Sequence, residues 1–505
     1  MMFGDENEGG PASEPGWSPE EIYASWTDFY TKSFSSIEFT KLEFAELLTI
    51  LLFLKIDHEH GQQHNDRLRA ANPPVVDPGL GWDSFQDLDG DSLRKQFEQV
   101  VRELQKPQAA SSLPPGVDPE LTTRLAVFRG AKLKDDRHVG QLTSLIKDEI
   151  GPRNWAGHRR ETGQAYERLL RFCASDIDSN RDAGQILTPR PLLAAIAEVL
   201  AIGPDDVVAD PAAGTGGALL AAYDRATMTG GAFPFDACIG ADEGQNMVRL
   251  ATMNLLLNTG RRFCDPAPVG KANSLAQAGG VVHRPGPQRP PTVVICNPPF
   301  ASNAKAPVHR TDLKGTKNVP ANFLQHISAG LPIGARAAVF LPESVLGLDF
   351  AKTILRTLMQ DCDVHTLLRL PPGTFRNGTA KAPIRANVLF FDKKGPRPDG
   401  RPVSGPLWDY DARPIAADVF LASGLADFVH ACRPGLPRSE RMAAPRFEVH
   451  LASAVVASSY QLGQLVHGSG EISDGFRPPR EIAKEIADQL AEAQSVFDQL
   501  ANQLP

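Results

Sequence analysis

The 505-residue chain has few cysteines and no surplus of positive charge. Its six cysteines are scattered and no two form a Cys-X-X-Cys pair, which argues against a structural zinc site and is typical of a reducing cytoplasm. The formal net charge is −8, whereas proteins that hold DNA unaided usually carry a basic surplus. If the chain binds DNA, we expect a partner to share the contacts.

Long apolar segments and internal repeats are also lacking, and we expect no leader sequence. The best apolar run, residues 44–56, is too short and too charged to span a membrane. Residues 1–19 are acidic and rich in Gly and Pro, which predicts disorder, and they show no signal-peptide pattern. We therefore predict a cytoplasmic protein of two or three domains without membrane association.

Two periodicities divide the chain. Up to about residue 176 apolar residues recur at helical spacing, and from about residue 184 short apolar runs alternate with helical stretches. The second pattern is typical of a mostly parallel sheet covered on both faces. Helices are predicted at residues 20–57, 91–104, 119–176, 218–225, 246–258 and 322–330, and strands at 207–210, 237–242, around 262–269, 292–296, 337–341, 364–370 and 387–392.

These patterns predict an α/β, Rossmann-like fold with additional helical parts. Residues 20–160 form a helical domain, residues 161–415 hold the sheet, and residues 416–505, where the sheet pattern is absent, form a helical extension. Within the extension, residues 479–504 carry an apolar stripe at spacings of three and four. This stripe either packs on the chain's own body or docks a partner.

The most specific motif is Asn297-Pro298-Pro299-Phe300, directly after the apolar run 292–296. Neither proline can donate to a sheet ladder and both fix φ, so a rigid turn follows the strand at its ligand-binding end. The Asn297 side chain and a nearby backbone carbonyl can accept both hydrogens of an exocyclic amino group, while Phe300 stacks on the ring that bears it. The motif therefore indicates methylation of an amino group on a base or an amide.

A glycine-rich turn, DPAAGTGG at residues 210–217, follows the first predicted strand. It lacks the Lys-Ser/Thr of a phosphate-binding loop and the full GxGxxG spacing. Together with the downstream tetrapeptide it favours S-adenosylmethionine, because backbone N–H groups and a carboxylate can meet a cationic amino acid. The residues predicted to bind the cofactor here are Asp210, Ala212, Gly214, Thr215 and Gly216.

Further positions complete the predicted cofactor site. Asp242 ends the second strand, where an acid can accept hydrogen bonds from both ribose hydroxyls, or alternatively cap the next helix. Thr188 before Pro189 is predicted to cap a helix, with the proline at the first helical position, and to close over the methionine end. Asn273 could contact the adenine, with a plain loop role as the alternative.

A basic loop follows the tetrapeptide at residues 301–319. Its cations could hold DNA phosphates and close on an extruded base, or could simply be solvated. No metal site is predicted. The candidates for DNA contact are Lys305, Arg310, Lys314 and Lys317.

These motifs resemble the amino-group DNA methyltransferases, and more narrowly the modification (M) subunits of type I restriction-modification systems. Three departures from that family are Ile186 and Leu187 where the family's TP motif usually carries an aromatic residue, Asn273 for Asp, and Cys296 for Ala. The resemblance rests on an ordered series of phrases: LFLK at 52–55, YE and LL within 166–170, DPAAGTGGALL at 210–220, RLATMNLLL at 249–257, NPPF at 297–300, NFLQH at 322–326, AAVFLPESVL at 337–346, LPPGTF at 370–375, NVLFF at 387–391 and WDYD at 408–411.

The resemblance implies a class I S-adenosylmethionine-dependent methyltransferase that acts on N6 of adenine in double-stranded DNA. Asn297 and the Pro298 carbonyl would accept the amino hydrogens. Because no DNA-reading module is evident after the last predicted strand, it also implies a separate specificity (S) subunit, which residues 479–504 would contact. A second copy of the chain and a restriction (R) subunit would complete the complex. The alternatives are a methyltransferase of a related phage-defence system, a protein-glutamine or ribosomal RNA guanine-N2 methyltransferase, and a non-catalytic scaffold.

Overall fold

The chain forms two compact units, residues 1–465 and residues 466–505, and all described residues belong to the first. The predicted docking helix at residues 479–504 therefore lies outside the described residues. The computed structural model describes residues 16–35, 39–62, 75–106, 136–173, 187–230, 237–260, 268–276, 281–282, 289–300, 316–347, 349–375, 385–441, 446–450, 455 and 462.

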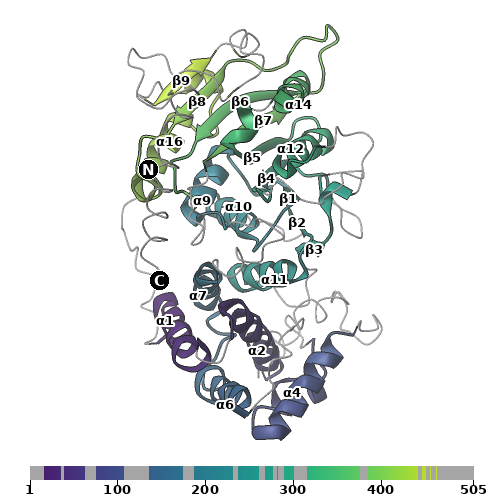
Figure 1. Cartoon of the computed structure of the whole chain (residues 1–505), viewed down its shortest axis with the longest axis vertical. Helices are drawn as coiled ribbons and strands as arrows, with labels where there is room; N and C mark the ends of the chain where they lie inside the picture. Colours follow the sequence, from purple (N-terminus) through teal and green to yellow (C-terminus); the bar gives the residue numbers. More distant parts are fainter. Residues whose placement is uncertain are drawn as a thin grey trace, which may run out of the picture. The chain divides into compact units, whose positions relative to one another are not determined.

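Among the described residues, nine strands form one mixed sheet in the order β3-β2-β1-β4-β5-β7-β6-β8-β9 (Figure 1). The strands β3, β2, β1, β4 and β5 run parallel, β7 is antiparallel to both β5 and β6, and β9 is antiparallel to β8. The α/β class is confirmed. The strands are β1 (Val208–Asp210), β2 (Cys238–Asp242), β3 (Val269–Lys271), β4 (Val293–Cys296), β5 (Arg336–Pro342), β6 (Cys362–Arg369), β7 (Ala386–Lys393), β8 (Leu407–Asp411) and β9 (Phe447–His450).

Two strand predictions need correction. The sheet does not end before residue 416, because β9 pairs with β8 at its edge. The four residues of β9 alternate between apolar and polar and form no apolar run like that of β4, which also has four residues. β3 begins at Val269, the last residue of the predicted segment, and residues 261–267 lie outside the described part of the chain.

Helices cover both faces of the sheet. One group, α9, α10 and α16, packs together, and α12 packs with α14 on the other side (Figure 1). No helix in the described residues is long and apolar enough to cross a bilayer. The helices of this part are α9 (Arg190–Val199), α10 (Gly217–Met228), α11 (Gln245–Thr259), α12 (Val319–Gly330), α13 (Glu343–Gly347), α14 (Asp349–Asp361), α15 (Ala417–Val419) and α16 (Leu425–Cys432).

The N-terminal part is helical, as the spacing of apolar residues predicts. Its central helix α2 begins with a capping box, in which the Thr40 hydroxyl accepts from the Glu43 N–H and the Glu43 carboxylate accepts from the Thr40 N–H. Fourteen of the 21 residues of α2 are buried, among them every residue of the range 44–54, which explains its continuous apolar sequence. The helices are α1 (Pro19–Phe29), α2 (Lys41–Gly61), α4 (Gly90–Leu104), α6 (Asp136–Ser144) and α7 (Arg159–Phe172), with π-helical turns η1 (Tyr30–Phe34) and η6 (Leu145–Ile150) and 3-10 turns η3 (Pro78–Leu80) and η4 (Trp82–Ser84).

Helix α11 joins the helical part to the sheet. Val248 and Leu255 belong to the core beneath the sheet, whereas Leu250 and Met253 belong to the core of the N-terminal helices. On the helical side the Arg249 guanidinium is fully buried and lies 2.7 Å from the Glu46 carboxylate of α2. A helix with two buried faces needs apolar residues all round, which accounts for the RLATMNLLL phrase.

Candidate active site

The glycine turn between β1 and α10 adopts a backbone that only glycine accommodates easily. Gly214 and Gly216 have φ values of +53° and +80°. A Cβ at Gly216 would lie 3.2 Å from Leu255 of α11, so the turn fits closely on that helix. The Asn254 side chain of α11 also donates to the Thr215 carbonyl at 3.0 Å. The turn is therefore held in place before any ligand arrives.

Two buried carboxyl groups face this turn. Asp210 ends β1 and Asp242 ends β2, with exposed fractions of 3% and 7%. Asp242 accepts from the Gly214 N–H at 3.0 Å and from the Gly244 N–H at 2.7 Å, which fixes both of its oxygens. Burial raises the pKa of Asp210 to about 7 and the pKa of Asp242 to about 6, although backbone N–H groups partly offset that rise.

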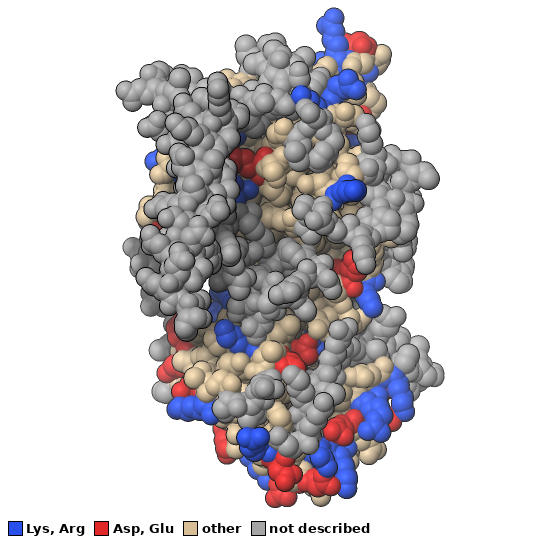
Figure 2. Space-filling view, viewed as in Figure 1, with Lys and Arg blue, Asp and Glu red and all other residues tan. Residues whose placement is uncertain are grey.

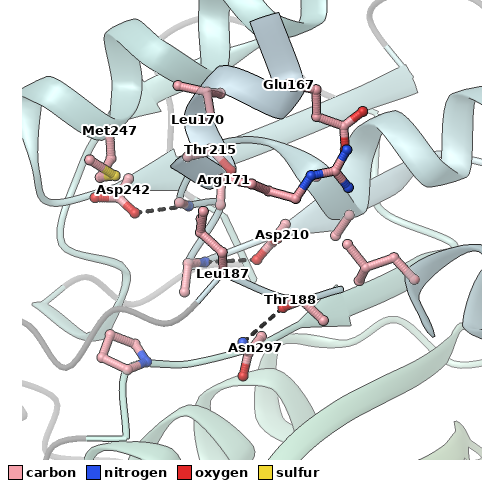
Figure 3. Close-up of a pocket in the computed structure, with 17 residues that line it drawn as sticks. Glu167, Leu170, Arg171, Leu187, Thr188, Asp210, Thr215, Asp242, Met247 and Asn297 are labelled. Carbon is pink, nitrogen blue, oxygen red and sulfur yellow. Dashed lines mark hydrogen bonds between the residues drawn. The ribbon is translucent and has the colours of Figure 1, made fainter. Parts of the chain in front are cut away.

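The Asn297 side chain follows β4 at the same edge of the sheet. Its amide nitrogen donates to the Thr188 hydroxyl at 2.8 Å (Figure 3). The prediction that Thr188 caps a helix is wrong, because α9 begins at Arg190 with Pro189 as its N-cap and no capping side chain. The Thr188 hydroxyl instead meets the amide of the tetrapeptide, a contact between residues 109 positions apart.

The Phe300 ring is half-buried against the core beneath the sheet. It lies edge-on to Phe375, with ring centroids 5.7 Å apart, and Phe375 in turn lies edge-on to Phe340 of β5 at 5.9 Å. Phe375 belongs to the LPPGTF phrase, which the sequence did not link to the tetrapeptide. The Asn297 turn thus adjoins a cluster of aromatic rings in which Phe300 is half-buried and Phe375 and Phe340 are buried.

A pocket that opens to solvent lies between these elements. Of the residues predicted to bind the cofactor, the structure brings Thr188, Asp210, Ala212, Gly214, Thr215, Asp242 and Asn297 to its lining, and Pro299 joins them. Residues that sequence reasoning missed also line it: Glu167, Leu170, Arg171, Leu187, Leu193, Ala213, Gly217, Ala218 and Met247.

The other described residues of the predicted catalytic and cofactor sites do not line the pocket. Pro189, Gly216, Pro298 and Phe300 are next to lining residues, but they are not themselves part of the lining. Asn273 also lies outside it, where its side chain donates to the Glu243 carboxylate at 3.4 Å and accepts from the Leu275 N–H at 3.0 Å.

The predicted DNA-contact loop lies largely outside the described residues. Lys305, Arg310 and Lys314 fall within residues 301–315, and only Lys317 is described, as an exposed residue. Figure 2 shows acidic and basic side chains interspersed over the described surface of the helical part on the face in view. Within the described residues, no group of three or more His, Cys, Asp or Glu side chains is placed to hold a metal ion.

Comparisons with known proteins agree with this geometry. The family described as N-6 DNA Methylase matches residues 158–417. The type I restriction enzyme StySPI methylase subunit of Salmonella potsdam is 32% identical over 391 residues, 72% of this chain and 66% of that protein. The EcoKI methylase subunit of Escherichia coli is 31% identical over 390 residues, with the same two coverages. The chain thus spans about two thirds of the length of these curated relatives.

Solved structures share the fold. A chain from a structure of a type I restriction-modification system, solved to explain complex assembly and conformational transition, superposes with a TM-score of 0.70 at 21% identity, over 97% of this chain and 98% of that one. A modification subunit assigned to a type I restriction enzyme of Vibrio vulnificus superposes with a TM-score of 0.62 at 20% identity, over 88% and 94% of the two chains.

Proposed function

The chain belongs to the N-6 DNA methylase family, and from this premise we propose that it transfers a methyl group from S-adenosylmethionine to N6 of adenine in double-stranded DNA. The observation that carries the proposal is the meeting of the Asn297 amide with the glycine turn and Asp242 in one pocket. The curated relatives are named as methylase subunits of type I restriction enzymes, which supports the role of modification subunit in a type I complex. In the proposed complex a separate specificity subunit selects the sequence.

The pocket fits S-adenosylmethionine by its chemistry. Asp242 holds two carboxylate oxygens at a strand end, where they can accept hydrogen bonds from the ribose hydroxyls. At Gly214, which lines the pocket and carries no side chain, the backbone of the glycine turn can come close to the ligand. Asp210 supplies negative charge for a cationic ligand. When bound, the cofactor supplies an electrophilic methyl group on a sulfonium centre.

The residues of this chain would act on the adenine mainly by positioning it. The extruded base stacks on Phe300, a contact worth roughly 1–3 kcal/mol in comparable base–aromatic pairs. The Asn297 side-chain oxygen and the Pro298 carbonyl accept the two amino hydrogens, which directs the nitrogen lone pair away from the ring. With no covalent nucleophile, the rate acceleration comes from positioning and fixed dipoles.

Thr188 is expected to set the orientation of the catalytic amide. Its hydroxyl accepts a hydrogen bond from the Asn297 amide nitrogen. This hydrogen bond fixes the rotation of the amide group and therefore the direction of its carbonyl oxygen. Thr188→Val removes a hydrogen bond worth about 1 kcal/mol and should lower kcat roughly 5- to 10-fold, with little change in cofactor Kd. Thr188→Ser should restore kcat. Single-turnover kinetics together with calorimetry would separate the two effects, and a wild-type kcat in Thr188→Val would refute this role.

Cofactor affinity should rise with pH up to about pH 7. In the free protein Asp210 holds its proton below its raised pKa of about 7, whereas a cationic ligand favours the ionised form. Binding therefore releases a proton, and affinity should be about tenfold weaker at pH 6 than at pH 8. Calorimetry in buffers of different ionisation enthalpy measures both quantities. Asp210→Asn should flatten the dependence, and a wild-type affinity that is constant from pH 6 to pH 8 would contradict this account.

The proposed acceptor can be tested by label transfer. The chain, with and without its specificity subunit, is incubated with methyl-tritiated S-adenosylmethionine and either plasmid DNA, ribosomal RNA or a bacterial protein extract. We expect label in DNA alone, and only with the specificity subunit present. Label in RNA or protein would favour the other amino-group methyltransferases, and cofactor binding without any transfer would favour a scaffold.

A further inference from the structure

One wall of the pocket comes from the N-terminal helical part rather than from the sheet. Helix α7 contributes Glu167, Leu170 and Arg171 to the lining. Glu167 and Arg171 are four residues apart, so they lie on the same face of the helix, one turn from each other. The function proposed above assigns no role to this pair of opposite charges.

The two ends of the pocket differ in chemistry. Figure 3 shows Asp242 and Met247 on one side, Glu167 on the other and Asp210 between them, with the Arg171 side chain directed toward Glu167. The proposed function places the ribose at Asp242. The opposite end, at α7, then receives the amino-acid end of the cofactor, which bears an α-carboxylate and an α-ammonium group.

The charges of the lining make Arg171 the natural partner of that carboxylate. Among the described residues that line the pocket, three are acidic and Arg171 alone is cationic. A carboxylate that enters beside Glu167, Asp210 and Asp242 needs a cation, and a guanidinium can bind it through two parallel hydrogen bonds. The Arg190 Nε lies 4.0 Å from the Glu167 carboxylate, and the Arg190 guanidinium also pairs with Asp224.

Close packing fixes α7 relative to the pocket. A Cβ at Gly163 would lie 2.8 Å from the Asn258 side chain of α11, so these two helices touch at a glycine. The Tyr166 hydroxyl, next to Glu167 in the sequence, lies 2.6 Å from the Thr49 hydroxyl of α2 in the buried interior. The two charged side chains therefore project from a rigid helix.

We propose that Arg171 binds the α-carboxylate of the cofactor and Glu167 its α-ammonium group. The N-terminal helical part then determines affinity for the amino-acid end, while the sheet determines affinity for the nucleoside end. The inference rests on the proposed function, because it takes S-adenosylmethionine as the ligand.

Ligand fragments test this division. Binding of S-adenosylmethionine, S-adenosylhomocysteine and 5′-methylthioadenosine, which lacks the amino-acid end, is measured by calorimetry on the full chain. Arg171→Met should weaken the first two about 10- to 100-fold and leave 5′-methylthioadenosine unchanged, since charge-assisted hydrogen bonds are lost only for ligands with a carboxylate. Glu167→Gln should act in the same direction. Arg160→Met, an exposed arginine of α7 outside the pocket lining, is the matched control and should change none of the three affinities.

The outcomes separate this inference from the proposed function. Equal weakening of all three ligands by Arg171→Met, at an unchanged melting temperature, would mean that α7 only shapes the pocket, and it would overturn the inference. Unchanged S-adenosylmethionine binding would also overturn it. Failure of the wild-type chain to bind any of the three ligands would instead overturn the proposed function.

Discussion

Asn297→Ala should lose methyl transfer by about 10³-fold or more while the protein folds and still binds its cofactor, because this amide positions the amino group that reacts. The Asn297 side chain follows β4 at the pocket, and its nitrogen donates a hydrogen bond to the Thr188 hydroxyl. Truncation to alanine therefore removes the side-chain oxygen that would accept an amino hydrogen of the adenine. Transfer is measured with tritiated cofactor and plasmid DNA in the presence of the specificity subunit, and folding by the melting temperature.

Asn154→Ala provides the control for this substitution, because Asn154 is an exposed residue outside the pocket lining. It should transfer methyl groups at the wild-type rate. Methylation by Asn297→Ala at a rate close to that of the control would remove the tetrapeptide from the mechanism. Loss of folding would be visible as a lowered melting temperature and would call for Asn297→Asp as the replacement variant.

Arg249→Met should lower the free energy of unfolding by about 3–5 kcal/mol, the largest stability effect expected here, because it leaves a buried carboxylate without its cation. The Arg249 side chain is 0% exposed and the Glu46 side chain 3% exposed, at 2.7 Å from each other. Urea denaturation of the purified chain measures the loss. Removing the acid as well, in Arg249→Met with Glu46→Leu, should recover part of it.

An ion pair on the surface serves as the control for the buried pair of Arg249 and Glu46. Arg168 and Glu20 also pair, but their side chains are 38% and 61% exposed, so Arg168→Met should cost less than about 1 kcal/mol. Equal losses for Arg168→Met and Arg249→Met would show that the buried pair does not link α2 to α11 in the way described.

Most of the sheet and half of the pocket could be predicted from the sequence. β4 and the turn after it were predictable because apolar β-branched residues and two prolines act locally. Asp242 and the glycine turn were predictable for a related reason, since the carboxyl ends of parallel strands meet at one edge of a sheet.

The remainder depends on contacts that no local pattern encodes. Glu167 and Arg171 reach the pocket because α7 crosses α11 closely at Gly163. Their spacing of four residues showed a common helical face but not what that face meets. Thr188 carried the signature of a helix cap, yet its hydroxyl is used by Asn297. The edge strand β9 has four residues, too few for its alternation to be recognised.

Identification of the methylated base tests the central claim most directly. Plasmid DNA labelled by the chain together with its specificity subunit is digested to nucleosides, which are separated and identified by mass spectrometry. We predict that the transferred methyl group is found in N6-methyl-2′-deoxyadenosine, and that the Asn297→Ala variant yields none. A methyl group on cytosine instead, or methylated adenine at wild-type levels from the variant, would contradict the account.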